Sequence, residues 1–341
     1  MTTQVPNTAV PALEIDPEHL PRDSDSSFGE DVSDELSVFT TSLSPSVTNY
    51  PTEHGRRYHA FRPGVYILPN DEAELDRLDI THFLITKGTG DKLFHAPIPQ
   101  NVQRVLDVGT GTGIWAIEMG DLYPGAEILG NDLSPVQPSW VPPNVKFEVD
   151  DIEDTWSHPI PFDFIFCRYM ATSILDWPRL VRNIYNNTKP GGWAEFQDFD
   201  LQYYSDDDSL KPEHETLRWI NVLLDASRHN GRNPCPGPLL EQLVRGVGFT
   251  NVHHEKFKLP IGPWAKDKKK KEVGLFNLVQ ILDGLEGFSL RLFTNVLGWE
   301  LEEVQVMLAK VRSELKSKAI HAQFDIHIAY GQRPSILEAN A

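Results

Sequence analysis

Cysteine is scarce in this sequence: Cys167 and Cys235 are the only two among 341 residues. Two cysteines cannot build a disulfide framework, and neither has a neighbour at CxxC spacing, so we expect two reduced thiols and no metal site. No apolar run approaches the roughly 20 residues that cross a bilayer, and the first ten residues lack the basic start and apolar stretch of a signal peptide. These absences predict a protein without a membrane span that stays in the cytoplasm.

Basic residues are also in short supply, because 31 Lys and Arg stand against 49 Asp and Glu, giving a formal net charge of -18. A nucleic-acid binder needs a broad basic surface to neutralise phosphates, so we expect no direct binding of nucleic acid. Residues 1–55 are strongly acidic and contain one base, Arg22. Being rich in Pro, Ser and Thr, most of this segment is expected to be a disordered tail, either simply solvated or binding a partner.

From Asn101 onward, short β-branched and aromatic runs alternate with segments of helical periodicity, which is typical of a parallel sheet covered on both faces. The expected strands are 104–108, 127–130, 145–149, 162–167, 193–197, 257–259 and 324–330. The expected helices are 71–87, 114–122, 177–186, 213–228, 238–247, 272–285 and 300–315, with a shorter one after Ser134. The fold class is therefore α/β, with a doubly wound, mostly parallel seven-stranded sheet. Right-handed crossovers place the carboxyl ends of the parallel strands on one rim, where ligands of such sheets bind.

A glycine-rich turn, VLDVGTGTGIW, follows the first strand of this expected sheet. Its glycines allow positive φ and a close approach of the backbone to a ligand. A dinucleotide site prefers G-x-G-x-x-G, but Ile114 stands where the third glycine would be. Asp107, two residues before the first glycine, would oppose a phosphate and favour a sulfonium ligand that carries an ammonium group. The turn therefore predicts S-adenosylmethionine (SAM) as cofactor, bound by Asp107, Gly109, Thr110, Gly111 and Gly113.

Acidic residues follow the next two strands at the same rim. Asp132 lies 19 residues after Gly113, where a carboxylate can accept hydrogen bonds from both hydroxyls of a ribose. Helix capping is the alternative role for Asp132. After the third strand, Asp150 or Asp151 can accept from the adenine amino group while Ile152 packs on the ring; a solvated acidic loop is the alternative. The predicted cofactor-binding residues in these two segments are Asp132, Leu133, Asp151 and Ile152.

The glycine turn and acidic positions, in this order, resemble class I SAM-dependent methyltransferases over roughly residues 100–200. A narrower resemblance, to the LaeA-like methyltransferases of filamentous fungi, extends from about Arg56 to Pro334. It rests on RRYHAFRPGVYILPNDEAELDRLDITHFL, LDVGTGTGIWAIEM, FEVDDIEDTW, CRYMATSILDWPRL, KPGGWAEFQDFD and LFTNVLGWELEEVQVMLAKVRSELK. The resemblance implies a fungal source and a role in secondary metabolism, either as a regulator of gene clusters or as a tailoring enzyme.

The resemblance also defines the expected domain organisation. Residues 56–100 would form an N-terminal helical lid over the methionine end of SAM, with Tyr58, His59 or Arg62 near its carboxylate. Residues 101–334 would form the methyltransferase domain, with a helical cap at about 205–315, and residues 335–341 a tail. Arg168, directly after the fourth strand, would face the cofactor or the acceptor and completes the predicted cofactor site.

The acceptor and the catalytic base are less constrained. Asp198, Asp200, His214 and His229 are candidate bases near the rim, with Asp198 and His214 the two retained, although each also suits a surface or packing role. CRYMA stands where many N-methyltransferases of amides and amines carry an asparagine-proline-proline-aromatic motif, which disfavours adenine or glutamine acceptors. We expect a small-molecule acceptor; the alternative is a regulator that works through a protein partner, with nuclear import through the lysine run 266–271.

Overall fold

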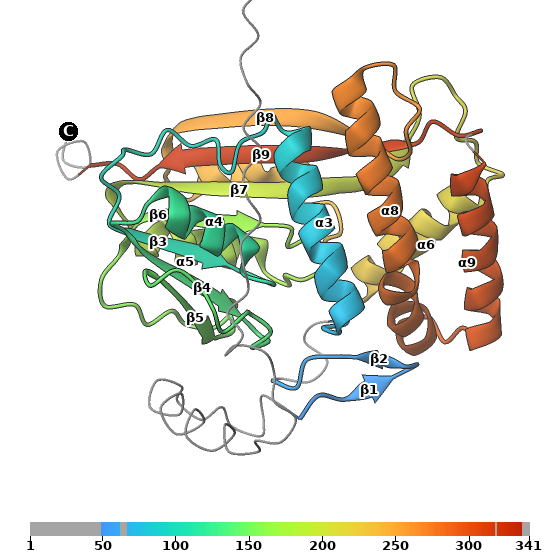
Figure 1. Ribbon diagram of the computed structural model, residues 1–341, viewed down its shortest axis with the longest axis horizontal. Helices are drawn as coiled ribbons and strands as arrows, with labels where there is room; N and C mark the ends of the chain where they lie inside the picture. The colour runs from blue at the N-terminus through green and yellow to red at the C-terminus, as the bar shows by residue number, and fades with distance from the viewer. Residues whose placement is uncertain (1–48, 62–66, 318, 336–341) are drawn as a thin grey trace, which may run out of the picture. The chain divides into compact units, whose positions relative to one another are not determined.

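A seven-stranded sheet forms the centre of the fold (Figure 1). The computed structural model describes residues 49–61, 67–317 and 319–335. The strands lie in the order β5 (Val145–Val149), β4 (Glu127–Asp132), β3 (Arg104–Val108), β6 (Phe162–Arg168), β7 (Thr188–Tyr204), β9 (Gln323–Gln332) and β8 (Thr250–Pro260). The first five run parallel, whereas β9 is antiparallel to both β7 and β8. The predicted fold class is confirmed.

Seven α-helices accompany the sheet in the described part of the chain (Figure 1). They are α3 (Glu72–Gly88), α4 (Ile114–Leu122), α5 (Trp177–Asn187), α6 (Glu215–His229), α7 (Leu240–Gly246), α8 (Lys268–Arg291) and α9 (Leu301–Lys316). A π-helical turn, Leu292–Val296, continues α8. A small hairpin of β1 (Thr52–Glu53) and β2 (Arg56–Arg57) precedes α3.

The central strands are buried on both faces, which explains their continuous apolar sequences. Successive side chains of a strand point to opposite faces, so Leu106 and Val108 of β3 pack in the cluster that contains α5 and α7. Val105 lies in the opposite cluster, with Trp115 of α4. The Trp115 ring stacks on Phe166 of β6 with centroids 4.0 Å apart. Two helical layers therefore fix the strand ends that form the ligand-binding rim.

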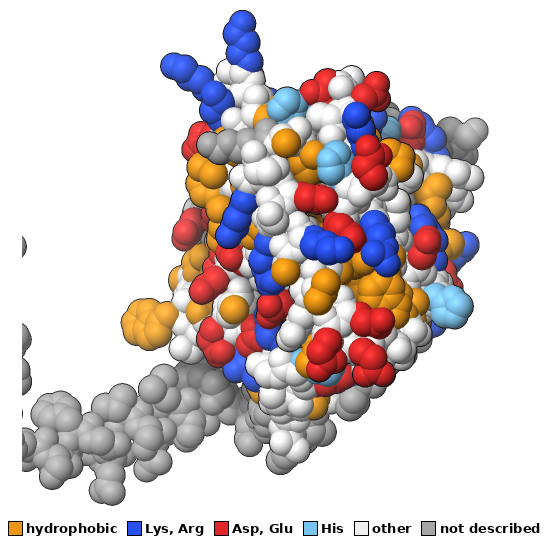
Figure 2. Space-filling model, turned by 90° about the vertical axis from the view of Figure 1, so that its right-hand side faces the viewer, with side chains coloured by type: hydrophobic (Ala, Val, Ile, Leu, Met, Phe, Trp, Pro, Cys, Tyr) orange, Lys and Arg blue, Asp and Glu red, His pale blue; other side chains and the backbone are white. Residues whose placement is uncertain are grey.

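Helices α6, α8 and α9 form a cap against the long β7 and the antiparallel strands β8 and β9. Their largest cluster of buried side chains includes Trp219, Phe293 and Phe324. The indole Nε1 of Trp219 donates to Ser289 Oγ at 2.8 Å, which joins α6 to α8. On the face that carries α9, Figure 2 shows acidic and basic side chains interspersed, so this face offers no continuous basic surface.

Several sequence predictions need correction. The short helix expected after Ser134 does not form: the segment between β4 and β5 is irregular. Four prolines in residues 134–144 each lack a backbone donor, and the Ser134 amide donates to the Asp132 side chain at 3.0 Å instead. The strand expected at 257–259 is the eleven-residue β8. The helix expected at 272–285 is longer at both ends, because α8 already begins at Lys268 within the lysine run.

The predicted acidic tail and C-terminal tail lie largely outside the described residues, as does Arg62. Within the tail's expected bounds, Thr52–Glu53 forms a strand. Cys167 is buried, Cys235 is partly buried, and both are free thiols. Within residues 49–61, 67–317 and 319–335, no helix is long and apolar enough to cross a membrane. The same residues contain no group of three or more His, Cys, Asp or Glu side chains placed to hold a metal ion.

Candidate functional site

A cleft lies at the carboxyl ends of β3, β4, β5 and β6, beneath helix α3. Every residue predicted to bind cofactor lines it except Gly113: Asp107, Gly109, Thr110, Gly111, Asp132, Leu133, Asp151, Ile152 and Arg168. The cleft therefore unites segments that are far apart in the sequence, as the rim of a doubly wound sheet requires.

The glycine turn brings backbone to the floor of the cleft. Gly109 and Gly111 have φ of 69° and 57°, a left-handed conformation that side chains disfavour. A β-carbon on Gly109 would lie 2.6 Å from the sulfur of Met170, so a larger residue at this position would overlap with the Met170 side chain. Gly113, with φ 82°, does not line the cleft. A β-carbon added at this position would lie 2.5 Å from the Phe147 ring, so close packing requires the glycine.

Two carboxyl groups flank the glycine turn, Asp107 being buried and Asp132 partly buried. Asp107 accepts from the Thr110 hydroxyl at 2.6 Å, and Asp132 accepts from the amides of Gly111 and Ser134 at 2.9 and 3.0 Å. Burial raises the pKa of both Asp107 and Asp132 to about 6, although these hydrogen bonds lower it in part. The site therefore holds negative charge that a cationic ligand would stabilise.

The third acidic position lies after β5. Asp151 is 6% exposed and Ile152 is 7% exposed, so the loop is not the freely solvated one that formed the alternative. The Oδ1 atom of Asp151 accepts from the Glu153 amide at 2.9 Å, which fixes the carboxylate. Asp150 lines the same cleft, and the choice between the two aspartates remains a prediction.

Helix α3 covers the cleft, and its apolar side chains Leu75, Leu78 and Ile85 belong to the lining. Beside them, His82 Nδ1 lies 2.6 Å from Arg168 Nη2, and His82 Nε2 lies 3.2 Å from Glu118. Burial, followed by the charge of Arg168, lowers the pKa of His82 to about 3, so the imidazole is neutral and accepts from Arg168. The buried Nη1 of Arg168 has no hydrogen-bond partner within the described structure.

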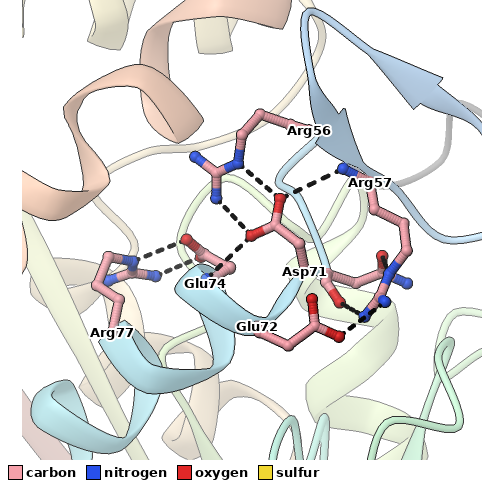
Figure 3. A network of polar contacts seen from close by, with 7 residues as sticks. Arg56, Arg57, Asp71, Glu72, Glu74 and Arg77 are labelled. Carbon is pink, nitrogen blue, oxygen red and sulfur yellow. Dashed lines mark hydrogen bonds and ion pairs between the residues drawn. The ribbon is translucent and has the colours of Figure 1, made fainter.

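A network of arginines and carboxylates fixes the start of α3 (Figure 3). Asp71 caps the helix by accepting from the Glu74 amide at 3.1 Å. Its carboxylate also accepts two hydrogen bonds from Arg56 of β2, at 2.6 and 2.8 Å. The side chain of Glu74 does not complete a capping box, because it pairs with Arg77 at 2.6 Å, both residues being at most 2% exposed. The hairpin is thereby joined to the helix that covers the cleft.

Two of the three lid residues predicted near the cofactor carboxylate, Tyr58 and His59, lie outside the cleft. Tyr58 and His59 are 0% and 1% exposed and do not line the cleft. The Arg291 guanidinium lies over the Tyr58 ring, 4.4 Å from its centroid. Tyr58 therefore packs against the end of α8, and α3 itself supplies side chains that face the cleft.

A second cavity adjoins the cleft, between the end of β7 and helices α6 and α8. Tyr169 lines both cavities. The lining of the second cavity is largely apolar, and Ile281, Phe288 and Leu292 come from the helical cap expected at about 205–315. Its other members include Ile67, Leu68, Phe199, Leu201, Tyr203, Trp219, Ile220, Leu223 and Phe324.

The turn after β6 is held by Asp198, one of the candidate bases. The carboxylate of Asp198 accepts from the amides of Met170, Ala171 and Phe199 at 2.7, 3.2 and 2.8 Å. Burial raises its pKa to about 7. Because Asp198 lines neither cavity, its geometry indicates a positioning role for the turn that carries Tyr169.

The other retained base candidate, His214, lies at the start of α6 and outside both cavities. Its Nδ1 accepts from the Lys211 amide at 2.8 Å, which suits a role at the helix start. Sequence reasoning missed His82 and Tyr169. By its spacing, His82 belongs to the apolar face of a helix, which indicates packing rather than a site. Tyr169 directly follows Arg168, so its position at a strand end was the one available signal.

The glycine turn, the carboxylates at successive strand ends and the covering helix define the class of protein as a class I SAM-dependent methyltransferase. A family model described as a methyltransferase domain matches residues 80–254. The methyltransferase pytC of Aspergillus terreus is 48% identical over 295 residues, which cover 86% of this chain and 91% of that protein. The secondary metabolism regulator laeA of Monascus pilosus is 38% identical over 301 residues, covering 86% and 81%.

A third relative, named protein-methionine methyltransferase laeA, from Emericella nidulans, is 37% identical over 305 residues, covering 86% of this chain and 80% of that protein. The chain belongs to the LaeA-like methyltransferases of filamentous fungi. The predicted family, the enzyme class and SAM as the cofactor are confirmed.

Proposed function

We propose that the cleft holds SAM with each polar part of the cofactor against a complementary group of the chain. Asp107 accepts from the ammonium group, and Arg168 donates to the carboxylate through its unpaired Nη1. Asp132 accepts from the ribose hydroxyls. Asp151 accepts from the adenine amino group while Ile152 packs against the ring. The single observation that carries this assignment is the buried, unpaired Nη1 of Arg168, because a buried donor atom without an acceptor is costly unless a ligand supplies one.

When bound, SAM supplies a methyl group on a sulfonium that is already a good leaving group. The chain mainly has to orient the acceptor and exclude water. Leu75, Leu78 and Ile85 of α3 give the cleft an apolar cover. The structure therefore supports α3, rather than the residues before it, as the lid within the proposed segment 56–100.

We propose that the acceptor is a small, partly apolar metabolite of the fungus. Two observations support this choice. The second cavity has a mostly apolar lining and shares Tyr169 with the cleft, as expected for the acceptor side of the site. The relative that is simply named a methyltransferase is 48% identical, whereas the relatives named for laeA reach 36–38%.

The second candidate is a regulator that binds SAM and works through protein complexes. It is supported by the name of the Emericella nidulans relative and by the exposed side chains of Lys266, Lys268, Lys269 and Lys271. Such a run could bind import machinery or an acidic partner. Under this proposal the protein works in the nucleus and methylates a protein side chain; under the first it works in the cytoplasm.

Incubation of the protein with methyl-labelled SAM and a fungal extract separates these candidates. The first proposal expects label in the fraction soluble in organic solvent, and the second expects label in precipitated protein. Label in protein alone would contradict the first. A protein that binds SAM but labels neither fraction would contradict the assignment of a methyl acceptor in both cases.

A further inference from the structure

Tyr169 is the residue that the cofactor cleft and the second cavity share. Its φ of 60° is unusual for a residue with a side chain. The turn holds this conformation, because the Tyr169 amide donates to Gln197 at 3.0 Å and the next two amides donate to Asp198. The ring of Tyr169 also meets Phe199 edge to face at 5.1 Å. Strain that is maintained by several contacts is typical of functional positions.

The phenol group of Tyr169 is set up as a hydrogen-bond donor. Its oxygen accepts from Arg77 Nη1 at 3.1 Å, and the hydroxyl hydrogen has no acceptor among the residues that the structure describes. Burial raises the pKa of Tyr169, an effect that the neighbouring Arg77 charge opposes. The group therefore stays protonated and cannot serve as a base near neutral pH.

Arg77 behind this phenol is fixed from several sides. It pairs with Glu74, donates to Gln280 of α8 at 3.0 Å and lies over the Phe288 ring, 4.8 Å from its centroid. A buried ion pair of this kind stabilises a fold less than apolar packing of the same volume would. The Arg77 guanidinium donates to the phenol oxygen of Tyr169, which polarises the phenol and restricts the direction of its O–H bond.

The other polar groups of the second cavity are partly engaged within the protein. Ser227 donates to the Leu223 carbonyl at 2.8 Å, and both ends of the Gln280 amide bond to protein atoms. The hydroxyls of Tyr169, Thr172 and Tyr203 remain to meet a ligand in an otherwise apolar lining. The cavity thus suits an apolar skeleton that bears few polar atoms.

We propose that Tyr169 donates a hydrogen bond to an acceptor oxygen at the boundary of the two cavities, and so selects O-methylation of an apolar hydroxy compound. This inference rests on the proposed function. An oxygen has two lone pairs, so one can accept from Tyr169 while the other attacks the methyl carbon. An amine nitrogen has a single lone pair, which the same hydrogen bond would occupy.

The transfer balances with SAM and water alone. A bond forms between the acceptor oxygen and the methyl carbon, while the carbon–sulfur bond breaks and leaves its electron pair on sulfur. The hydroxyl proton leaves the site to the bulk solvent. The products are a methyl ether, a neutral thioether and one released proton.

The test compares Tyr169→Phe with Tyr185→Phe, a matched loss of a phenol hydroxyl on α5, away from both cavities. Labelling of the extract with methyl-labelled SAM is expected to fall by roughly tenfold in Tyr169→Phe, the effect of losing one neutral hydrogen bond, and to be unchanged in Tyr185→Phe. The affinity for SAM, measured by calorimetry, should change less than about twofold in both. The labelled product should be a methyl ether.

A second measurement does not depend on turnover. The acceptor, purified by following the label, is titrated into each variant saturated with S-adenosylhomocysteine, and Tyr169→Phe should bind it at least about tenfold more weakly than wild type. Ser227→Phe, which fills the cavity from α6, should abolish this binding and retain SAM affinity.

The outcomes are separable. Methylation on nitrogen, or equal acceptor binding by wild type and Tyr169→Phe, would overturn the inference and leave the proposed function standing. A wild-type protein that labels no small molecule would overturn both.

Discussion

The affinity for SAM should depend steeply on pH between 5 and 7, because two carboxyl groups with raised pKa values line the proposed cofactor cleft. The pKa of both Asp107 and Asp132 is about 6. A group with this pKa is about 90% ionised at pH 7 and about 10% ionised at pH 5. If only the ionised form binds, each carboxyl weakens SAM binding about tenfold over this range, and the two together up to about a hundredfold. Because the two groups interact, the observed midpoints belong to the pair.

Titration calorimetry with SAM at pH 5, 6 and 7 measures this dependence, and working at or below pH 7 keeps the cofactor's ammonium group protonated. Asp107→Asn retains the shape of the side chain and should reduce the effect from about a hundredfold to about tenfold.

The contribution of the same two carboxyl groups to the stability of the free protein has the opposite pH dependence. The folded-state pKa values exceed the ordinary aspartate value of about 3.9, so the contribution of these groups is complete below pH 4 and is lost as pH rises through 6. Because SAM binds more tightly as the two carboxyl groups ionise, the increase in Tm caused by SAM should grow from pH 5 to pH 7. An affinity that stays constant between pH 5 and pH 7 would refute the assignment of Asp107 and Asp132.

Three further predictions concern the framework of the site. Gly109→Ala should cost about 2–4 kcal/mol in urea denaturation, from the left-handed φ and the overlap with Met170; a cost like that of Gly125→Ala, which has open space, would contradict this. Arg77→Met should lower the free energy of unfolding by about 3–5 kcal/mol, because it leaves Glu74 buried and unpaired. The double change Arg77→Met with Glu74→Met should recover most of this loss; no recovery would contradict the proposed effect of the unpaired Glu74. Asp198→Asn should cost about 1–3 kcal/mol, since an amide cannot accept on both sides, and an unchanged Tm would refute the proposed role in the turn.

The sheet was predictable because its signals are local. Strands β3 and β5 match their predicted bounds, since short apolar runs between turn residues define them. Helix α4 matches for a similar reason, as it begins directly after Gly113. The cofactor carboxylates could be found because strand-end position in a doubly wound sheet fixes where they meet.

What the sequence could not reveal depends on contacts between distant residues. Gly113 is required by the ring of Phe147, 34 positions further on. Asp198 has the residue type of a base, but three backbone amides occupy its oxygens. The left-handed conformation of Tyr169 has no local sequence signal, because it results from the hydrogen bonds of its turn to β7. Position on a strand end therefore predicted membership of the rim, but not the role of each residue there.

The most direct test of the account is the calorimetric titration of SAM into wild type and Asp132→Ala, with Asp163→Ala, which lies at the opposite end of β6, as the matched control. Loss of two hydrogen bonds to a charged group should weaken SAM binding by roughly 100-fold or more, while the control retains wild-type affinity. NAD should not bind to any of the three proteins. Equal affinity of wild type and Asp132→Ala for SAM, or binding of NAD by the wild type, would contradict the proposed cofactor site.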